Sequence, residues 1–310
     1  MISLNKNEIT AKLPSMNDVM EMMKQSYIDY SNNDFEIPPV GHMPLPNGEL
    51  HIKYGIGKKQ HYAAIKIASG SYTNYKIGLP NSYGCIMLIN SETGFPEYLL
   101  NDEGILTDHR TAAAGGMLAK EIVGNIPEVS FGIIGCGIQG YYQAIYTCNA
   151  LSIEHIFVYD ISEDNINTLQ NKLAEHNITI SRCDSVESLC KQCDVITTVT
   201  PAKAGYIKYE WLKANAHINA FGCDTKEKQE LDESVIKNAE FILADSLIQC
   251  STQGELQYLY NDKNHPEIKR KTIEFGTYLN NPNRYQKNRV TVADFTGIAS
   301  QDIIIANAVI

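Results

Sequence analysis

The stretch Val129–Gly140, VSFGIIGCGIQG, decides the fold of this chain. Its first half is an apolar run that predicts a buried strand, and its second half has the spacing G-x-G-x-x-G and leads directly into a helical segment. Glycines so placed permit a tight turn, a close approach of backbone N–H groups to a pyrophosphate, and close packing of helix on strand. A glycine-rich turn without a ligand is the alternative. We expect a dinucleotide site that includes Gly135, Gly137, Ile138, Gln139 and Gly140.

Asp160 helps to distinguish NAD from NADP as the dinucleotide that the site would bind. It ends the next expected strand, twenty residues after Gly140, where an acidic side chain accepts hydrogen bonds from the ribose hydroxyls of adenosine. A 2′-phosphate would be repelled there, and the next residues, Ile161 and Ser162, supply no cation to hold it. We therefore expect NAD rather than NADP as the cofactor. The alternative role for Asp160 is a helix N-cap, which Ser162 can also provide.

Strands and helices alternate after Arg110, and this alternation predicts a parallel sheet with crossover helices. The number of strands suits a Rossmann-type, doubly wound sheet. We expect strands at residues 129–135, 155–160, 178–183, 194–200, 217–221, 241–245 and 289–294.

The residues before Arg110 have a different pattern. We predict a strand at residues 2–13 and a helix that Ser15 opens, with Asp18 as its capping partner. From Pro38 to Leu100, short β-like runs are broken by glycine, proline and asparagine, which predicts a mainly β region.

These patterns together predict an α/β protein of two domains. A mainly β (α+β) domain would comprise residues 1–115 and 295–310, with a terminal helix from about Gly297 packing back on it. Residues 116–294 would form the NAD-binding Rossmann domain.

The overall composition excludes some partners and locations. The chain has 310 residues, a formal net charge of −10 and 44% hydrophobic residues, and its sequence pI is about 5.3. A nucleic acid or an anionic membrane surface needs a basic field, so we expect neither as a partner. The sequence shows no signal peptide and no apolar run of membrane-spanning length, so we expect a cytoplasmic protein.

The cysteines predict neither disulfides nor a metal site. The chain has eight of them, and buried free thiols are the expected state in a large chain without a secretion signal. Cys190 and Cys193 form one C-x-x-C, but no second pair or histidine stands at metal-ligand spacing. We interpret the pair as chance and expect no metal.

Three residues have the chemistry that an amino-acid oxidation needs, namely cations for a carboxylate and a group that relays a proton. Lys66 lies inside an apolar strand, Arg110 lies in LTDHRTAAAGG at 106–116, and Asp224 follows the expected strand at 217–221. Open α/β sheets place ligands at such carboxyl ends of strands. The alternatives are an edge lysine, an arginine in a surface ion pair or on the cofactor phosphate, and an aspartate that caps a loop.

The arrangement of these segments resembles the ornithine cyclodeaminase/mu-crystallin family over nearly the whole chain. The resemblance implies a homodimer whose first domain carries the substrate site and the interface. It implies that Lys66 and Arg110 hold the α-carboxylate of the substrate and that Asp224 lies beside the reacting amine or imine. We also expect Thr111 and Thr200 to contact the cofactor. The matching motifs are Gly78–Pro80, Ala63–Ile67, Leu106–Gly116, Gly135–Gly140, Asn219–Asp224, Glu230–Asp232, Gly254–Leu256 and Val290–Gly297.

Two positions depart from the family pattern. Many members carry an arginine after a Pro-Pro pair, but here Val40, Gly41 and His42 follow it. Lys53 stands where ornithine-processing members carry an acidic residue, and its charge would oppose the distal ammonium of ornithine unless it points to solvent. We include His42 and Lys53 among the candidate substrate-binding residues.

The leading functional prediction is an NAD-dependent cyclodeaminase, with L-ornithine to L-proline plus ammonia as the reference reaction. NAD would take a hydride from the α-carbon and Asp224 would relay a proton. Ammonia would leave as the side-chain amine closes the ring, and NADH would return the hydride to the cyclic imine. The alternative is an imino-acid (ketimine) reductase or amino-acid dehydrogenase without ring closure. A non-catalytic, nucleotide-dependent ligand-binding protein of mu-crystallin type is disfavoured, because a pure binder has little need of Lys66, Arg110 and Asp224 together.

Overall fold

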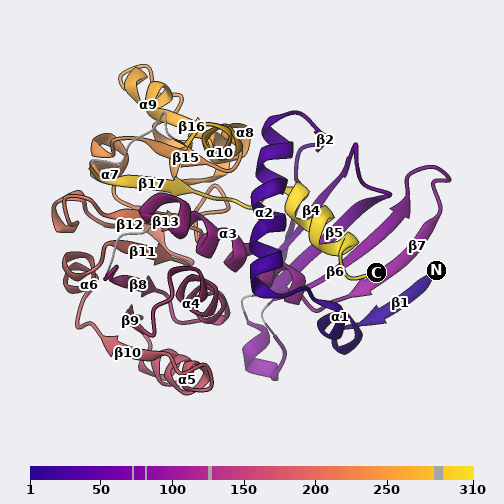
Figure 1. Cartoon of the computed structure of the whole chain (residues 1–310), viewed down its shortest axis with the longest axis horizontal. Coiled ribbons are helices and arrows are strands. Elements are labelled where there is room, and N and C mark those ends of the chain that lie inside the picture. The colour runs from indigo at the N-terminus through magenta and orange to yellow at the C-terminus, as the bar shows by residue number, and fades with distance from the viewer. Residues whose placement is uncertain (72, 81, 125–127, 283–288) are drawn as a thin grey trace. The chain divides into compact units, whose positions relative to one another are not determined.

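The computed structural model describes residues 1–71, 73–80, 82–124, 128–282 and 289–310. The chain divides into two compact units, the first made of residues 1–110 and 298–310 and the second of residues 111–297 (Figure 1). The expected α/β fold is confirmed, since one unit holds a mainly antiparallel sheet and the other a parallel one.

The first unit is built on a sheet of order β1-β7-β6-β5-β4-β2, with β3 paired to β4. All pairs are antiparallel except that of β1 with β7. The elements are β1 (Ile2–Asn5), α1 (Lys6–Lys12), α2 (Met16–Ser31), β2 (Phe35–Glu36), β3 (Gly41–Leu45), β4 (Gly48–Gly57), β5 (Tyr62–Ser71), η1 (Asn74–Ile77), β6 (Ser82–Asn90), β7 (Pro96–Asn101) and α11 (Ala299–Asn307). Helix α3 (Ile105–Val123) begins in this unit and continues into the second.

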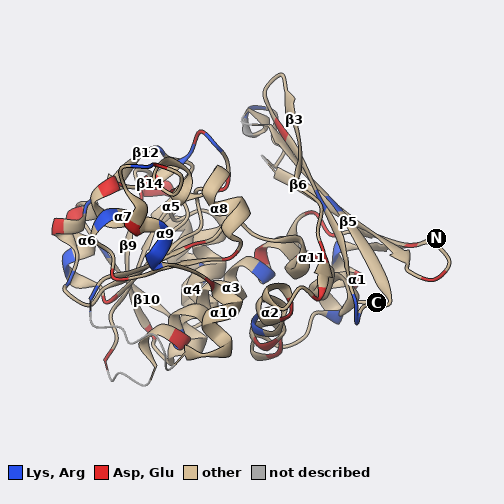
Figure 2. Ribbon diagram, turned by 90° about the horizontal axis from the view of Figure 1, so that it is seen from above, with Lys and Arg blue, Asp and Glu red and all other residues tan. Residues whose placement is uncertain are grey.

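Helix α11 covers one face of this sheet at β4, β5 and β6, and α2 packs against α11 (Figure 2). Ala64, Ile86 and Leu88 point into the core on that face, because alternate residues of a strand face the same side. Ser15 caps α2 as predicted, accepting a hydrogen bond from the Asp18 N–H. The prediction that the terminal helix packs back on the first part of the chain is also confirmed.

The predicted strand at residues 2–13 is wrong beyond Asn5, where helix α1 begins. The Asn5 side chain accepts hydrogen bonds from the N–H groups of Asn7 and Glu8, and the Glu8 carboxylate accepts one from the Asn5 N–H. This capping box starts a helix at the point where the apolar pattern is compatible with either element.

The second unit is built on an all-parallel sheet of order β10-β9-β8-β11-β13-β17-β15-β16. The strand order reverses at β8, which makes the sheet doubly wound and puts a topological switch point between β8 and β11. The predicted strands are confirmed, each shortened by one to three residues in total, whereas β12, β14 and β16 were not anticipated.

Helices and short strands complete this unit. Its elements are β8 (Phe131–Ile134), α4 (Ile138–Leu151), β9 (His155–Tyr159), α5 (Glu163–Ala174), β10 (Thr179–Arg182), α6 (Val186–Gln192), β11 (Val195–Thr198), β12 (Lys203–Ile207), η2 (Tyr209–Trp211), β13 (His217–Ala220), β14 (Gln229–Leu231), α7 (Glu233–Asn238), β15 (Ile242–Ala244), α8 (Leu247–Gln253), η3 (Glu255–Tyr258), α9 (Pro266–Lys271), β16 (Thr272–Glu274), α10 (Phe275–Asn280) and β17 (Thr291–Asp294).

The cysteines are free thiols, as expected. Cys190 and Cys193 are buried, and burial raises the pKa of Cys190 to about 12 and that of Cys193 further still. Thiols of this kind are unreactive, in line with a chance C-x-x-C. Across the described ranges, no helix is both long enough and apolar enough to cross a membrane.

Candidate active site

The glycine-rich loop joins β8 to α4 as the sequence predicts. Gly135 has a φ of 101°, a conformation that favours glycine. A Cβ on Gly140 would lie 2.1 Å from the carbonyl oxygen of Gly135, so only glycine permits this contact between helix and loop. A Cβ on Gly137 would meet no atom within 4 Å, so the N-terminus of α4 has open space beside it for a ligand.

Asp160 connects the end of β9 to this loop. Its carboxylate accepts hydrogen bonds from the N–H of Cys136 at 2.7 Å and the N–H of Ser162 at 2.8 Å. Ser162, not Asp160, is the N-cap of α5. The adjacent Ile161 is 95% exposed, an apolar surface beside the expected adenosine position that our sequence reasoning did not include.

A cavity of about 230 Å³ opens in the second unit, near the carboxyl ends of β8, β11 and β13. It brings together Thr111, Gln139, Thr200 and Asp224, four predicted site residues that come from separate segments. The full lining is Thr111, Gln139, Val199, Thr200, Pro201, Phe221, Gly222, Asp224 and Lys228.

Asp224 is paired with a lysine that sequence reasoning missed. Lys228 Nζ lies 2.6 Å from Asp224 Oδ1, and the Asp224 side chain is 47% exposed. The available signal was a lysine of opposite charge only four residues after Asp224, across a turn. The cavity therefore contains a carboxylate and an ammonium side by side.

Glu230 holds the wall of this cavity in place. Its carboxylate is fully buried and accepts hydrogen bonds from the N–H and hydroxyl of Thr200 at 2.6 and 2.7 Å and from the N–H of Gly222 at 2.8 Å. Burial raises the pKa of Glu230, although these hydrogen bonds oppose the rise.

Two more buried acids hold the segment that carries Glu230, Glu255 through hydrogen bonds to its backbone and Asp294 through hydrogen bonds to the segment of Glu255. Glu255 accepts hydrogen bonds from the N–H groups of Glu230 and Leu231 at 2.7 and 3.1 Å. Asp294 accepts them from the N–H groups of Glu255 and Leu256 at 2.9 and 3.0 Å. Burial raises the pKa of Asp294 to about 7. The three acids thus link β17, η3 and β14 to the cavity wall, a role that their motifs alone did not reveal.

The first unit contains a buried charge cluster around Asp302 of helix α11. Asp302 Oδ1 lies 2.9 Å from Lys66 Nζ and 3.2 Å from Arg110 Nε, and all three side chains are buried. Arg110 also donates a hydrogen bond to Gln301 Oε1 at 3.2 Å. Sequence reasoning missed Asp302, although a polar Ser-Gln-Asp run in an otherwise apolar final helix was its signal.

Part of this cluster's hydrogen-bonding capacity is unused. Arg110 Nε and Asp302 Oδ2 are buried, yet within the part of the chain that the structure describes neither has a hydrogen-bond partner. The contact between Arg110 Nε and Asp302 is thus an ion pair without hydrogen-bond geometry. Buried polar atoms usually find partners, so these two atoms are a donor and an acceptor that the described residues leave unused.

Lys53 faces the same cluster. It lies directly opposite Lys66 in the antiparallel pair of β4 and β5, so both side chains leave the same face of the sheet. Burial alone would raise the pKa of Asp302, but Lys66, Arg110 and Lys53 together lower it below its usual value. Burial lowers the pKa of Lys66, against the pull of Asp302.

Charges of both signs surround Asp302. Lys66, Arg110 and Lys53 act on its carboxylate, and Asp102 acts on Lys66. Burial raises the pKa of Asp102. His42 is not part of this cluster but lies farther along the sheet, beside Glu49 and His51.

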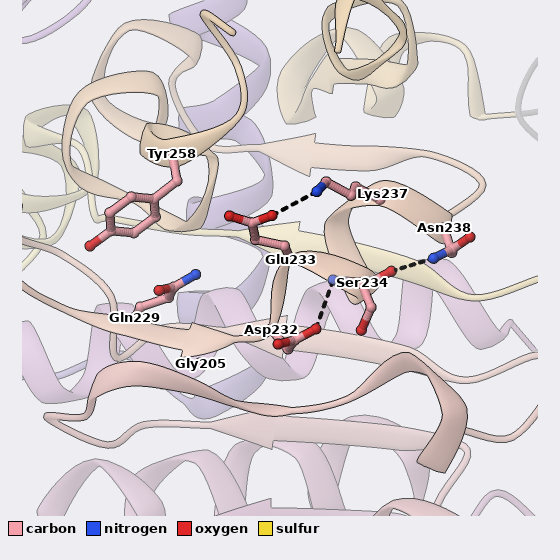
Figure 3. Close-up of a pocket in the computed structure, with 8 residues that line it drawn as sticks. All are labelled: Gly205, Gln229, Asp232, Glu233, Ser234, Lys237, Asn238 and Tyr258. Atoms are coloured by element: carbon pink, nitrogen blue, oxygen red, sulfur yellow. Dashed lines mark hydrogen bonds and ion pairs between the residues drawn. The ribbon is translucent and has the colours of Figure 1, made fainter. Parts of the chain in front are cut away.

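A larger hollow of about 570 Å³ in the second unit contains none of the predicted residues. Its polar side chains are largely paired with their own neighbours, such as Lys237 with Glu233 at 2.6 Å and the Asp232 carboxylate with the Ser234 N–H (Figure 3). We assign no role to it. It is lined by Gly205, Gln229, Asp232, Glu233, Ser234, Lys237, Asn238 and Tyr258.

A model of the ornithine cyclodeaminase/mu-crystallin family matches residues 3–310. The chain belongs to this family. It is 33% identical over 284 residues to an uncharacterized cyclodeaminase of Sinorhizobium fredii, covering 88% of this chain and 84% of that one. It is 30% identical over 308 residues to the alanine dehydrogenase of Archaeoglobus fulgidus, covering 99% and 93%.

A solved structure of an archaeal alanine dehydrogenase dimer with bound NAD has the same fold. It superimposes with a TM-score of 0.88 at 27% identity and covers all of this chain and 94% of its own. The chain described by our structure is therefore an enzyme, either a cyclodeaminase or an NAD-dependent amino- or imino-acid oxidoreductase.

Proposed function

We propose that this protein is an NAD(H)-dependent enzyme that transfers a hydride at the α-carbon of a small amino or imino acid. The observation that carries the proposal is the charge cluster of Lys53, Lys66 and Arg110 around Asp302. Lys66, Arg110 and Asp302 are buried, and the Arg110 Nε–H has no hydrogen-bond partner among the described residues. A substrate carboxylate would accept a charge-assisted hydrogen bond from that N–H.

NAD is the cofactor that the second unit fits best. The open N-terminus of α4 beside Gly137 suits a pyrophosphate, and the carboxylate of Asp160 opposes a 2′-phosphate. Gly135, Ile138, Gln139 and Gly140 would complete the cradle, with Thr111 and Thr200 on the cavity side. NAD, when bound, supplies the hydride acceptor of the reaction.

The side chains divide the remaining work. Lys66 and Arg110 would hold the α-carboxylate and so orient the α-carbon, with Asp302 keeping both cations in position. Asp224 would accept or relay the proton of the reacting amine. Its neighbour Lys228 would keep that carboxylate oriented in the cavity.

The charge at Lys53 bears on the substrate side chain. Because Lys53 faces Lys66 and Asp302, a distal ammonium such as that of ornithine would meet like charge. We therefore favour an amino-acid dehydrogenase or imino-acid reductase with a neutral or acidic substrate side chain. The cyclodeaminase that converts L-ornithine to L-proline plus ammonia is the second candidate, favoured by the 33% identity to an uncharacterized cyclodeaminase.

A substrate panel separates these activities. The protein is incubated with NAD and neutral, acidic or diamino acids, while NADH absorbance and the products are followed. Steady NADH formation identifies a dehydrogenase, whereas proline formed from ornithine without net NADH identifies a cyclodeaminase. If no amino acid reacts and no imino acid is reduced with NADH, the proposal is wrong.

Cofactor choice is tested by calorimetric titration. We expect NAD(H) to bind at least about tenfold more tightly than NADP(H), roughly 1.4 kcal/mol. Equal or reversed affinities would contradict the role given to Asp160.

We further propose that residues 1–115 and 295–310 form the substrate-binding and dimerisation domain and that residues 116–294 bind NAD. The sheet face opposite Lys66 carries exposed apolar side chains of Met43, Tyr54, Ile67 and Tyr83. Such a patch on a sheet is typical of a protein interface. A homodimer would bury it.

A further inference from the structure

The hairpin of β3 and β4 brings together His42, Glu49 and His51. Its two-residue connection sets the register, so that His42 lies directly opposite His51. Glu49 lies two residues before His51 on the same strand, so its side chain leaves the same face. The sequence separates these residues, and the hairpin makes them neighbours.

The three side chains converge on a small volume. Glu49 Oε2 lies 3.1 Å from His51 Nε2 and 3.6 Å from His42 Nε2, and one ligand atom from each residue lies within 4.8 Å of the others. Two ligands of a tetrahedral zinc ion, each bound at about 2.1 Å, stand about 3.4 Å apart. The two distances from Glu49 Oε2 are close to that separation.

We propose that His42, Glu49 and His51 form a binding site for a divalent transition-metal ion, with Zn²⁺ as the best fit. Two imidazoles and one carboxylate are a ligand set that zinc accepts, with a water molecule in the fourth position. The side chains of Glu49 and His51 are 24% and 21% exposed and that of His42 is 51% exposed, so an ion can enter.

The metal site lies on the same face of the sheet as Lys53 and Lys66, where we proposed that the substrate carboxylate binds. His51 and Lys53 are two residues apart on β4, about 7 Å along the strand, and their side chains share a face. The Glu49 carboxylate offsets part of the charge that the ion adds beside Lys53. The metal site stands on its own geometry, so it does not depend on the proposed reaction.

A simple ion pair is the competing explanation for these contacts. In that case the Glu49 oxygen would interact with both imidazoles through its two lone pairs, and added Zn²⁺ would not bind. The chain offers a matched pair for comparison, His265 and Glu267, whose Nδ1 and Oε1 atoms lie 3.1 Å apart. In the described ranges this pair belongs to no cluster of three such ligands.

The experiment is a calorimetric titration of tag-free, chelator-treated full-length protein with Zn²⁺ alone. We expect saturable binding of one ion per chain. His51→Ala and Glu49→Gln should each weaken binding at least about tenfold, and His265→Ala should leave it unchanged. Co²⁺ is a second probe, because its visible spectrum distinguishes tetrahedral nitrogen and oxygen ligands from the thiolates of the free cysteines.

His42→Ala is the variant least expected to disturb folding, because the side chain is half exposed and its removal should lower the free energy of unfolding little. Zn²⁺ should raise the melting temperature of the wild type and of His265→Ala, but not that of His42→Ala. Absence of saturable binding in the wild type, equal binding in all four variants, or a thiolate spectrum with Co²⁺ would each overturn the proposal.

Discussion

Asp302 is the residue that organises the candidate carboxylate site. It is buried in the first turn of α11 and lies within 3.2 Å of both Lys66 Nζ and Arg110 Nε. Removing one member of a buried ion pair leaves the other charge buried without a partner. The resulting loss of folding stability is larger than the net stabilisation that the pair provides. Asp302 is thus a positioning residue, whereas Arg110 and Lys66 are the groups that would touch substrate.

The role of Arg110 predicts a defect in substrate binding. Arg110→Ala should raise KM by about 10- to 100-fold, the value of a charge-assisted hydrogen bond of about 1.5–3 kcal/mol. Arg110→Lys should recover only part of the loss, because lysine lacks the planar fork of arginine. Steady-state kinetics on the true substrate measure both. Arg182→Ala, at an exposed arginine of β10, is the control, and an unchanged KM for Arg110→Ala would remove Arg110 from the clamp.

Asp224 predicts a defect in turnover instead. Asp224→Asn is nearly isosteric but cannot accept a proton, so kcat should fall by on the order of a hundredfold or more. NAD affinity, measured by titration, should change little. Glu227→Gln, at an exposed neighbour paired with Lys203, should keep normal turnover. Near-normal kcat for Asp224→Asn would make Asp224 a loop-shaping residue and move the proton relay to Lys66.

At the scale of elements, short polar motifs fix the positions of strands and helices around the cavity. Asp294 at the end of β17 holds the N-terminus of η3, Glu255 in η3 holds β14, and Glu230 in β14 holds Thr200 and Gly222. Because each acid accepts backbone N–H groups, each specifies the relative placement of two segments.

The raised pKa of Asp294 makes its contribution to stability depend on pH. Its folded pKa of about 7 exceeds the unfolded value, so the favourable contribution is complete below about pH 4 and is lost as the pH rises to about 7. Asparagine resembles the protonated acid and does not titrate. The free energy of unfolding of Asp294→Asn, relative to wild type, should therefore be higher at pH 8 than at pH 5.

Urea unfolding at pH 5 and pH 8 measures this difference. Asp232→Asn is the control, because hydrogen bonds from Ser234 lower the pKa of Asp232 and its effect should be the same at both pH values. If the Asp294→Asn difference does not change with pH, the acid is not protonated in the folded protein.

At the scale of the whole molecule, the exposed apolar face of the first sheet predicts a homodimer. Ile67 is 38% exposed near the middle of β5, on the face opposite Lys66. Ile67→Asp should shift the protein to monomers at micromolar concentration, because a buried unpaired charge opposes association. Light scattering measures the mass. Ile248→Asp, at an exposed isoleucine of α8, should stay dimeric, and a monomeric wild type would refute the prediction.

The sequence alone determined the family, the fold class and most strands of the second unit. The G-x-G-x-x-G loop and Asp160 could be placed because their spacing is local, and a strand, a turn and a helix follow one another in the chain. Motif and chemistry nominated Lys66, Arg110 and Asp224 as candidate site residues. The start of α1 was missed because the capping box of Asn5 and Glu8 outweighs an ambiguous apolar pattern.

The tertiary structure alone decided which charges meet. Asp302 is 236 residues from Lys66 in the chain, yet the two atoms lie 2.9 Å apart, and no local spacing predicts such a pair. The same holds for Glu230 with Thr200, for the side of the sheet that Lys53 faces, and for the convergence of His42 with Glu49 and His51. Contacts of this kind depend on register and on the packing of distant elements, which the whole fold determines and a local pattern does not.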